Sequence, residues 1–166
     1  MAIDFLKNCL WFVLAVLAQT IVLGRIHLFG CATPLLYVWL IILMPRNYPK
    51  WGILLWSFLL GATIDMFFNT PGVAAASLTL TGMVQPYLLE VFIPRDSADN
   101  LKPSATTLGL LRYGYFVGML VLLFCITFYS LELFSFYDFW LWLKHVGGST
   151  LITLILIFTF EAVRSK

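Results

Sequence analysis

The chain of 166 residues is too apolar for a soluble domain. Hydrophobic residues make up 61% of it, charged residues 11%, and its mean hydropathy is +0.95. The formal net charge is only +2, and the basic residues are spread over tails and loops, so nothing indicates a nucleic-acid partner. This composition predicts an all-α membrane protein.

Six apolar stretches are each close to the roughly 20 residues that a helix needs to cross a bilayer. They cover about 9–27, 30–45, 51–68, 71–92, 108–132 and 145–163. Six such helices use about 120 residues, which leaves too little sequence for a separate soluble domain. We therefore expect a single integral-membrane domain over residues 1–166, built as a bundle of six transmembrane helices.

The basic residues predict the orientation of this bundle, because cytoplasmic loops of membrane proteins carry an excess of lysine and arginine. With a cytoplasmic N-terminus, only Arg25 and Lys144 lie outside. The others then lie inside: Lys7, Arg46, Lys50, Arg95, Lys102, Arg112, Arg164 and Lys166. We predict that both termini are cytoplasmic.

Asp65 is the most unusual residue of the third stretch, because a carboxylate within a span is costly unless it faces protein or water. The turn Asn69-Thr70-Pro71-Gly72 follows it. We expect Asn69 or Thr70 to cap the fourth helix, with Pro71 in its first turn and Asp65 favoured by its positive end. The alternative is a ligand-binding Asp65 in a cavity open to the outside.

The fourth stretch is rich in small residues, and Ala75, Thr79 and Gly82 share one face by helical spacing. Small residues allow close helix contact, so we expect this helix at the centre of the bundle. Gln85 precedes Pro86, where we expect a kink, with Gln85 bonded to the carbonyl groups that the proline frees.

The longest polar stretch is the loop 94–104, PRDSADNLKPS, which includes Arg95 and Asp96. It is either a solvated connector or a docking site for a cytoplasmic partner.

Arg112 shares one predicted depth with Glu90 and Glu161. We expect it to pair with one of these carboxylates or to reach the phosphate headgroups of the lipid. Gly114 and Gly118 form a GxxxG pair in the same stretch, a motif of moderate specificity for helix contact.

Aromatic residues crowd the segment 134–142, which includes Trp140 and Trp142. They predict a short interfacial segment before the last helix, serving as a membrane anchor or as a contact surface for another membrane protein. The last helix then has a small, hydroxyl-rich start that includes Ser149. The three cysteines lack metal-ligand spacing and no acid pair, His cluster or Ser and Lys arrangement shares a depth, so we expect neither a cofactor nor an enzyme.

The order of four short motifs resembles that of the rod shape-determining protein MreD family, particularly its Bacteroidetes-like members. The motifs are GATIDMFFNTPGVAAASL, QPYLLEVFIPRD, LRYGYFVG and KHVGGSTLITLILIFTFE, and the resemblance extends from about Leu28 onward. Gln85 departs from the family pattern, in which an arginine precedes the proline.

The resemblance implies a non-enzymatic, multi-pass component of the cell-elongation machinery in the bacterial inner membrane. Its implied partners are an MreC-like bitopic membrane protein, the cell-wall transpeptidase and glycosyltransferase, and the actin-like MreB cytoskeleton. The Asp65 turn and the segment 134–142 would form the outer partner surface, and the loop 94–104 the inner one. The alternative is a substrate-binding membrane subunit of an energy-coupling factor transporter, with Asp65, Asn69 and Gln85 lining a pocket.

Overall fold

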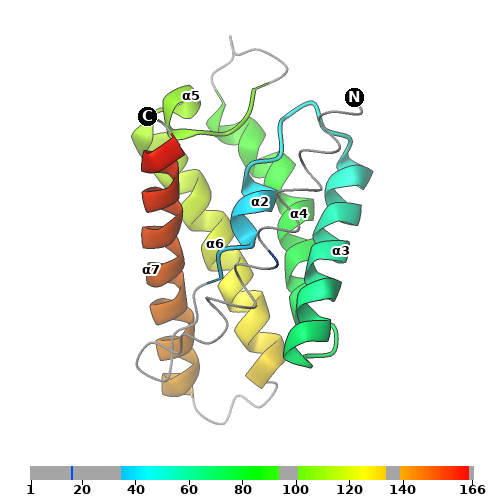
Figure 1. Cartoon of the computed structure of the whole chain (residues 1–166). Coiled ribbons are helices and arrows are strands. Elements are labelled where there is room, and N and C mark those ends of the chain that lie inside the picture. The colour runs from blue at the N-terminus through cyan, green and yellow to red at the C-terminus, as the bar shows by residue number, and fades with distance from the viewer. Residues whose placement is uncertain (1–15, 17–34, 94–100, 134–138, 165–166) are drawn as a thin grey trace.

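The computed structural model describes residues 35–93, 101–133 and 139–164, together with Val16. All regular structure in this part of the chain is helical. The helices are α2 (Val38–Ile42), α3 (Lys50–Phe68), α4 (Val73–Phe92), α5 (Ala105–Leu108), α6 (Leu110–Leu133) and α7 (Phe139–Arg164). The four long helices alternate in direction along the chain (Figure 1). The expected helix over 9–27 and the loop residues Arg95 and Asp96 lie outside the described residues.

Three of these helices are long and apolar enough to cross a membrane, namely Lys50–Phe68, Leu110–Glu132 and Phe139–Val163. They match the expected stretches 51–68, 108–132 and 145–163, although the last begins earlier. The fourth long helix, α4, has 20 residues and is more polar, because it contains hydroxyl residues, Gln85 and Glu90.

In the described residues, apolar side chains fill the core and also cover the outer faces, while several polar side chains are buried inside. Met66, Leu111 and Trp140 are each at least 75% exposed, and further large apolar residues cover the outer faces of all four long helices. The buried polar or charged residues are Ser57, Asp65, Ser77, Thr81, Gln85, Ser149, Thr150, Thr153 and Glu161. This distribution is typical of a membrane protein, because polar groups in lipid must find partners within the protein.

Helices α3 and α4 approach each other closely through small residues. A Cβ added to Gly61 would overlap the backbone of Ala75, and one added to Gly82 would overlap the side chain of Ser57. The predicted small-residue face of α4 therefore packs against α3. Helix α4 also contacts α2 and α6, which confirms its expected place at the centre of the bundle.

The expected helix over 30–45 is wrong in its described part, where only Val38–Ile42 is helical. The chain before α2 is held by a side chain instead, since Leu35 N–H donates to Thr153 Oγ1 of α7 at 3.2 Å. Pro45 disfavours helical geometry at the residue before it, which limits α2 on the other side. This single turn lies inside the bundle against α3, α4 and α6 and is too short to span a bilayer.

The last helix begins at Phe139, six residues before the expected start at 145. Trp140 and Trp142 therefore lie in its first turns, and the expected separate interfacial segment is wrong for residues 139–142. Helix α7 can begin this early because no glycine or proline interrupts the chain between residues 139 and 145. Residues 134–138 lie outside the described part.

Helix α4 continues through Pro86 to Phe92. Gln85 Nε2 donates to the carbonyl oxygen of Met44 at 3.2 Å, so its expected bond to the carbonyl groups freed by the proline is wrong. Gln85 instead joins α4 to the connection between α2 and α3.

Candidate functional site

The Asp65 carboxylate is buried and lies at the N-terminus of α4. Its Oδ1 accepts hydrogen bonds from Thr70 Oγ1 at 2.8 Å and from Ala74 N–H at 2.9 Å, and its Oδ2 accepts one from Ala75 N–H at 2.9 Å. The first N–H groups of a helix have no partner within the helix and carry its positive partial charge. Asp65, from the last turn of α3, therefore caps α4.

This arrangement corrects the expected capping scheme. Asn69 is left-handed, with φ 56°, and ends α3, while Gly72 precedes α4 with φ 82°. Pro71 lies before the first residue of α4 rather than in its first turn. Neither Asn69 nor Thr70 caps α4, because the carboxylate of Asp65 already occupies that position and Thr70 donates to it. The expected attraction between Asp65 and the positive end of α4 agrees with this geometry.

A cavity of about 510 Å³ opens at this corner and is lined in part by Asp65, Asn69, Pro71 and Gly72. Gln85 does not line it, because Gln85 lies ten residues beyond Ala75, about 15 Å along α4. The structure therefore does not bring Asp65, Asn69 and Gln85 together as a three-residue pocket.

The chemistry available to Asp65 is limited by its own hydrogen bonds. Both oxygens already accept N–H or O–H groups from the chain, so the carboxylate acts as a structural anion at a helix end. Within the described residues, no group of three or more His, Cys, Asp or Glu side chains could hold a metal ion.

Glu161 is the second buried carboxylate and lies at the opposite end of the bundle. It is 3% exposed. Its Oε1 accepts a hydrogen bond from Ala105 N–H at 3.2 Å, and its Oε2 accepts one from Tyr113 Oη at 3.5 Å. Glu161 thus joins α7 to α5 and to the beginning of α6.

The expected pairing of Arg112 with Glu90 or Glu161 does not occur among the described residues. Arg112 and Glu90 are both exposed, while Tyr113, the next residue of α6, is fully buried. Successive residues of a helix point about 100° apart, so α6 turns the tyrosine toward Glu161 and the arginine away from it.

Ser149 is buried between α6 and α7, where its hydroxyl shares a hydrogen bond with Tyr129 Oη at 2.5 Å. Thr153, one turn further along α7, accepts the bond from Leu35 N–H. Tyr113, Tyr129 and Thr153 were not among the predicted site residues. The spacing of Ser149 and Thr153, four residues apart on one helix face, was a usable signal for Thr153.

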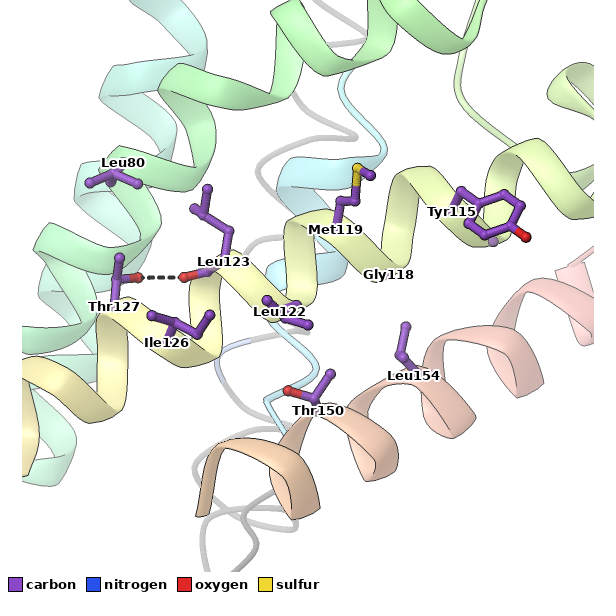
Figure 2. Close-up of a pocket in the computed structure, with 11 residues that line it drawn as sticks. Leu80, Tyr115, Gly118, Met119, Leu122, Leu123, Ile126, Thr127, Thr150 and Leu154 are labelled. Carbon is purple, nitrogen blue, oxygen red and sulfur yellow. Dashed lines mark hydrogen bonds between the residues drawn. The ribbon is translucent and has the colours of Figure 1, made fainter. Parts of the chain in front are cut away.

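The GxxxG pair does not bring α6 close to another described helix. A Cβ added to Gly114 would meet only Phe158 Cζ at 3.4 Å, and one added to Gly118 would meet nothing within 4 Å. Both glycines line an open apolar groove of about 680 Å³ on the face of α6, flanked by Leu80 of α4 and by Thr150 and Leu154 of α7 (Figure 2).

The two aromatic candidates at the start of α7 differ in environment. Trp140 is 75% exposed, whereas Trp142 is partly buried and stacks on Phe139 with ring centroids 5.7 Å apart. The turn after Asp65 lies at the same end of the bundle as this start of α7 (Figure 1).

Charged residues also differ between the two ends. Helix α3 begins, α4 ends and α6 begins at one end, which carries Arg46, Lys50, Lys102 and Arg112 (Figure 1). Lys144 lies near the start of α7, at the other end.

Comparisons with known protein families, characterised proteins and solved structures give no match to this chain. The resemblance to the MreD family therefore rests on the order of the sequence motifs alone.

Proposed function

We propose that this protein is a non-enzymatic, multi-pass scaffold of the bacterial inner membrane that serves the cell-elongation machinery. The observation that carries the proposal is the use of its buried charges. Asp65 and Glu161 each accept hydrogen bonds from the chain itself, and the outer faces of the long helices are apolar. The buried carboxylates thus stabilise the fold of the chain itself, and the apolar surface is available for contact with lipid and with other membrane proteins.

An enzyme would need reactive groups gathered around a substrate position. The two buried carboxylates lie at opposite ends of the bundle, and each accepts donors from its own surroundings. The apolar groove on α6 contains two threonines, and both donate to backbone carbonyl groups of their own helices. These features favour a scaffold over a catalyst.

The proposed orientation places the end with Arg46, Lys50, Lys102 and Arg112 in the cytoplasm, because basic residues accumulate there in membrane proteins. The turn after Asp65 and the exposed Trp140 then share the outer side of the membrane. Their common location supports the proposal that they form one outer surface for an MreC-like bitopic protein. The loop 94–104 would serve cytoplasmic partners such as the actin-like MreB cytoskeleton.

The proposal is tested by co-purification of the tagged protein with an MreC-like partner, the cell-wall transpeptidase and the glycosyltransferase from the native membrane. We expect a fixed stoichiometry with the MreC-like protein and rounded cells after depletion of this chain. A bound metabolite and transporter ATPase subunits in the purified complex would instead establish the energy-coupling factor alternative.

Two exposed tryptophans at opposite ends provide a matched pair of variants. Trp140 is 75% exposed and Trp51 is 71% exposed. We expect Trp140→Ala to reduce co-purification of the MreC-like protein severalfold, since aromatic residues contribute strongly at interface centres. Trp51→Ala should leave it unchanged. Equal loss with both variants, or with neither, would contradict the proposed outer surface.

A further inference from the structure

The apolar groove on α6 has a charged residue, Arg112, at one end. Arg112 is exposed and forms no ion pair among the described residues. Helical spacing places Arg112 on the same face as the groove residues Tyr115, Met119, Leu122 and Ile126, which follow it by 3, 7, 10 and 14 positions. The face therefore runs from a cation, past a tyrosine, into a largely apolar groove.

The length of the groove matches one leaflet of a membrane. Its lining on α6 extends from Gly114 to Thr127, about 20 Å at 1.5 Å per residue. One leaflet of a bilayer, including its headgroup region, is about 20 Å thick. Arg112 lies just beyond the groove toward the end where α6 begins, the position of a headgroup when the acyl chain lies along the helix.

The two threonine hydroxyl groups in the walls already donate their hydrogen bonds within the chain. Thr127 Oγ1 donates to the carbonyl oxygens of Leu123 and Phe124, and Thr150 Oγ1 donates to that of Val146. A Cβ added at Gly118, which lies between Met119 and Tyr115 in Figure 2, would meet no atom within 4 Å, so the groove is open there. Recognition within the groove therefore rests on apolar contact, and recognition at its end rests on charge.

We propose that this groove and Arg112 form a binding site for an anionic phospholipid, with an acyl chain along α6 and the phosphate at the guanidinium of Arg112. An arginine presents several donors to phosphate oxygens, and a tyrosine one turn away suits the interfacial depth. The proposal is independent of the cell-elongation role, because it depends only on a membrane location.

The test is native mass spectrometry of the delipidated full chain with phosphatidylglycerol or phosphatidylcholine of identical acyl chains. We expect about fivefold stronger retention of the anionic lipid, the effect of one basic residue near a membrane surface. Arg112→Gln should reduce this preference to near parity. The matched control Lys102→Gln removes an exposed cation at the same end, away from the groove, and should keep it.

Filling the groove tests the acyl-chain part separately. Gly118→Leu adds a side chain where open space exists, so the fold should survive, as checked by circular dichroism and size-exclusion chromatography. It should lower retention of both lipids. Unchanged retention in Gly118→Leu or Arg112→Gln would overturn the proposal, as would competition by inorganic phosphate as effective as that by the lipid. A photoreactive amino acid at Leu122 should crosslink lipid in native membranes, and crosslinking mainly to a protein helix would overturn it too.

Discussion

Among the described residues, each end of the bundle contains one buried carboxylate, and the two carboxylates have different partners. Asp65 accepts three short hydrogen bonds, at 2.8 to 2.9 Å, from residues 5, 9 and 10 positions further along the chain. Glu161 accepts longer ones, at 3.2 and 3.5 Å, from residues 56 and 48 positions away. Asp65 therefore stabilises the local turn between α3 and α4, whereas Glu161 connects α7 to α5 and α6, which lie far from it in the sequence.

The difference has a physical consequence for stability. The bonds of Asp65 are short, and the positive end of α4 adds to their strength. The bonds of Glu161 are longer and involve a four-residue helix and a tyrosine. We expect the Asp65 end to be the more resistant of the two to unfolding. Mutations there should lower the free energy of unfolding more than mutations at the Glu161 end.

The largest loss in the free energy of unfolding is expected for Asp65→Ala. It would leave the buried N–H groups of Ala74 and Ala75 without acceptors, which costs about 3 kcal/mol or more of unfolding free energy. Asp65→Asn keeps one oxygen acceptor and should lose about half as much. Reversible unfolding in mixed micelles measures both values. A loss below about 0.5 kcal/mol in Asp65→Ala would show that the three bonds carry no net stability.

The close contact that brings α4 to Asp65 is tested by Gly61→Ala. The added Cβ would overlap the backbone of Ala75 and push α4 away, at a cost of about 2 kcal/mol. Gly118→Ala is the matched control, because its Cβ meets no atom within 4 Å. The control should be neutral or stabilising by up to about 1 kcal/mol, the helix-propensity gain of alanine over glycine. Equal changes in the free energy of unfolding at the two glycines would contradict a close contact between α3 and α4 at Gly61.

The smallest loss in the free energy of unfolding is expected for Glu161→Gln. The amide retains an acceptor for Ala105 N–H but loses the charge, so we expect a loss of about 1 kcal/mol. Hydrogen exchange should accelerate in residues 101–109, where Glu161 holds the chain, and stay unchanged in residues 70–76. Acceleration in both regions would mean that the two carboxylates belong to one cooperative unit.

Hydrophobic length and spacing predicted most of the long helices. The stretches 51–68 and 71–92 match α3 and α4 within two residues at each boundary, because glycine, proline and left-handed asparagine interrupt the helices there. The stretch 30–45 failed because apolar length does not distinguish a spanning helix from a buried turn. Its α2 lies inside the bundle, so its apolar residues face protein.

The candidate sites were less predictable, because their partners come from elsewhere in the fold. The turn after Asp65 signalled a helix start, but the sequence did not show that the preceding helix supplies the cap. Glu161 was recognised as an acid at membrane depth. Its partners Ala105 and Tyr113 depend on how α5, α6 and α7 pack, which no local pattern encodes.

The local nature of the Asp65 bonds bears on how the protein enters the bilayer during synthesis. All donors and the acceptor lie between residues 65 and 75, so α3 and α4 contain every group that the cap requires, without α6 and α7. The negative charge of the carboxylate and the positive end of α4 can then enter the bilayer together, each stabilising the other. Insertion of this hairpin need not await a counter-ion from a later segment.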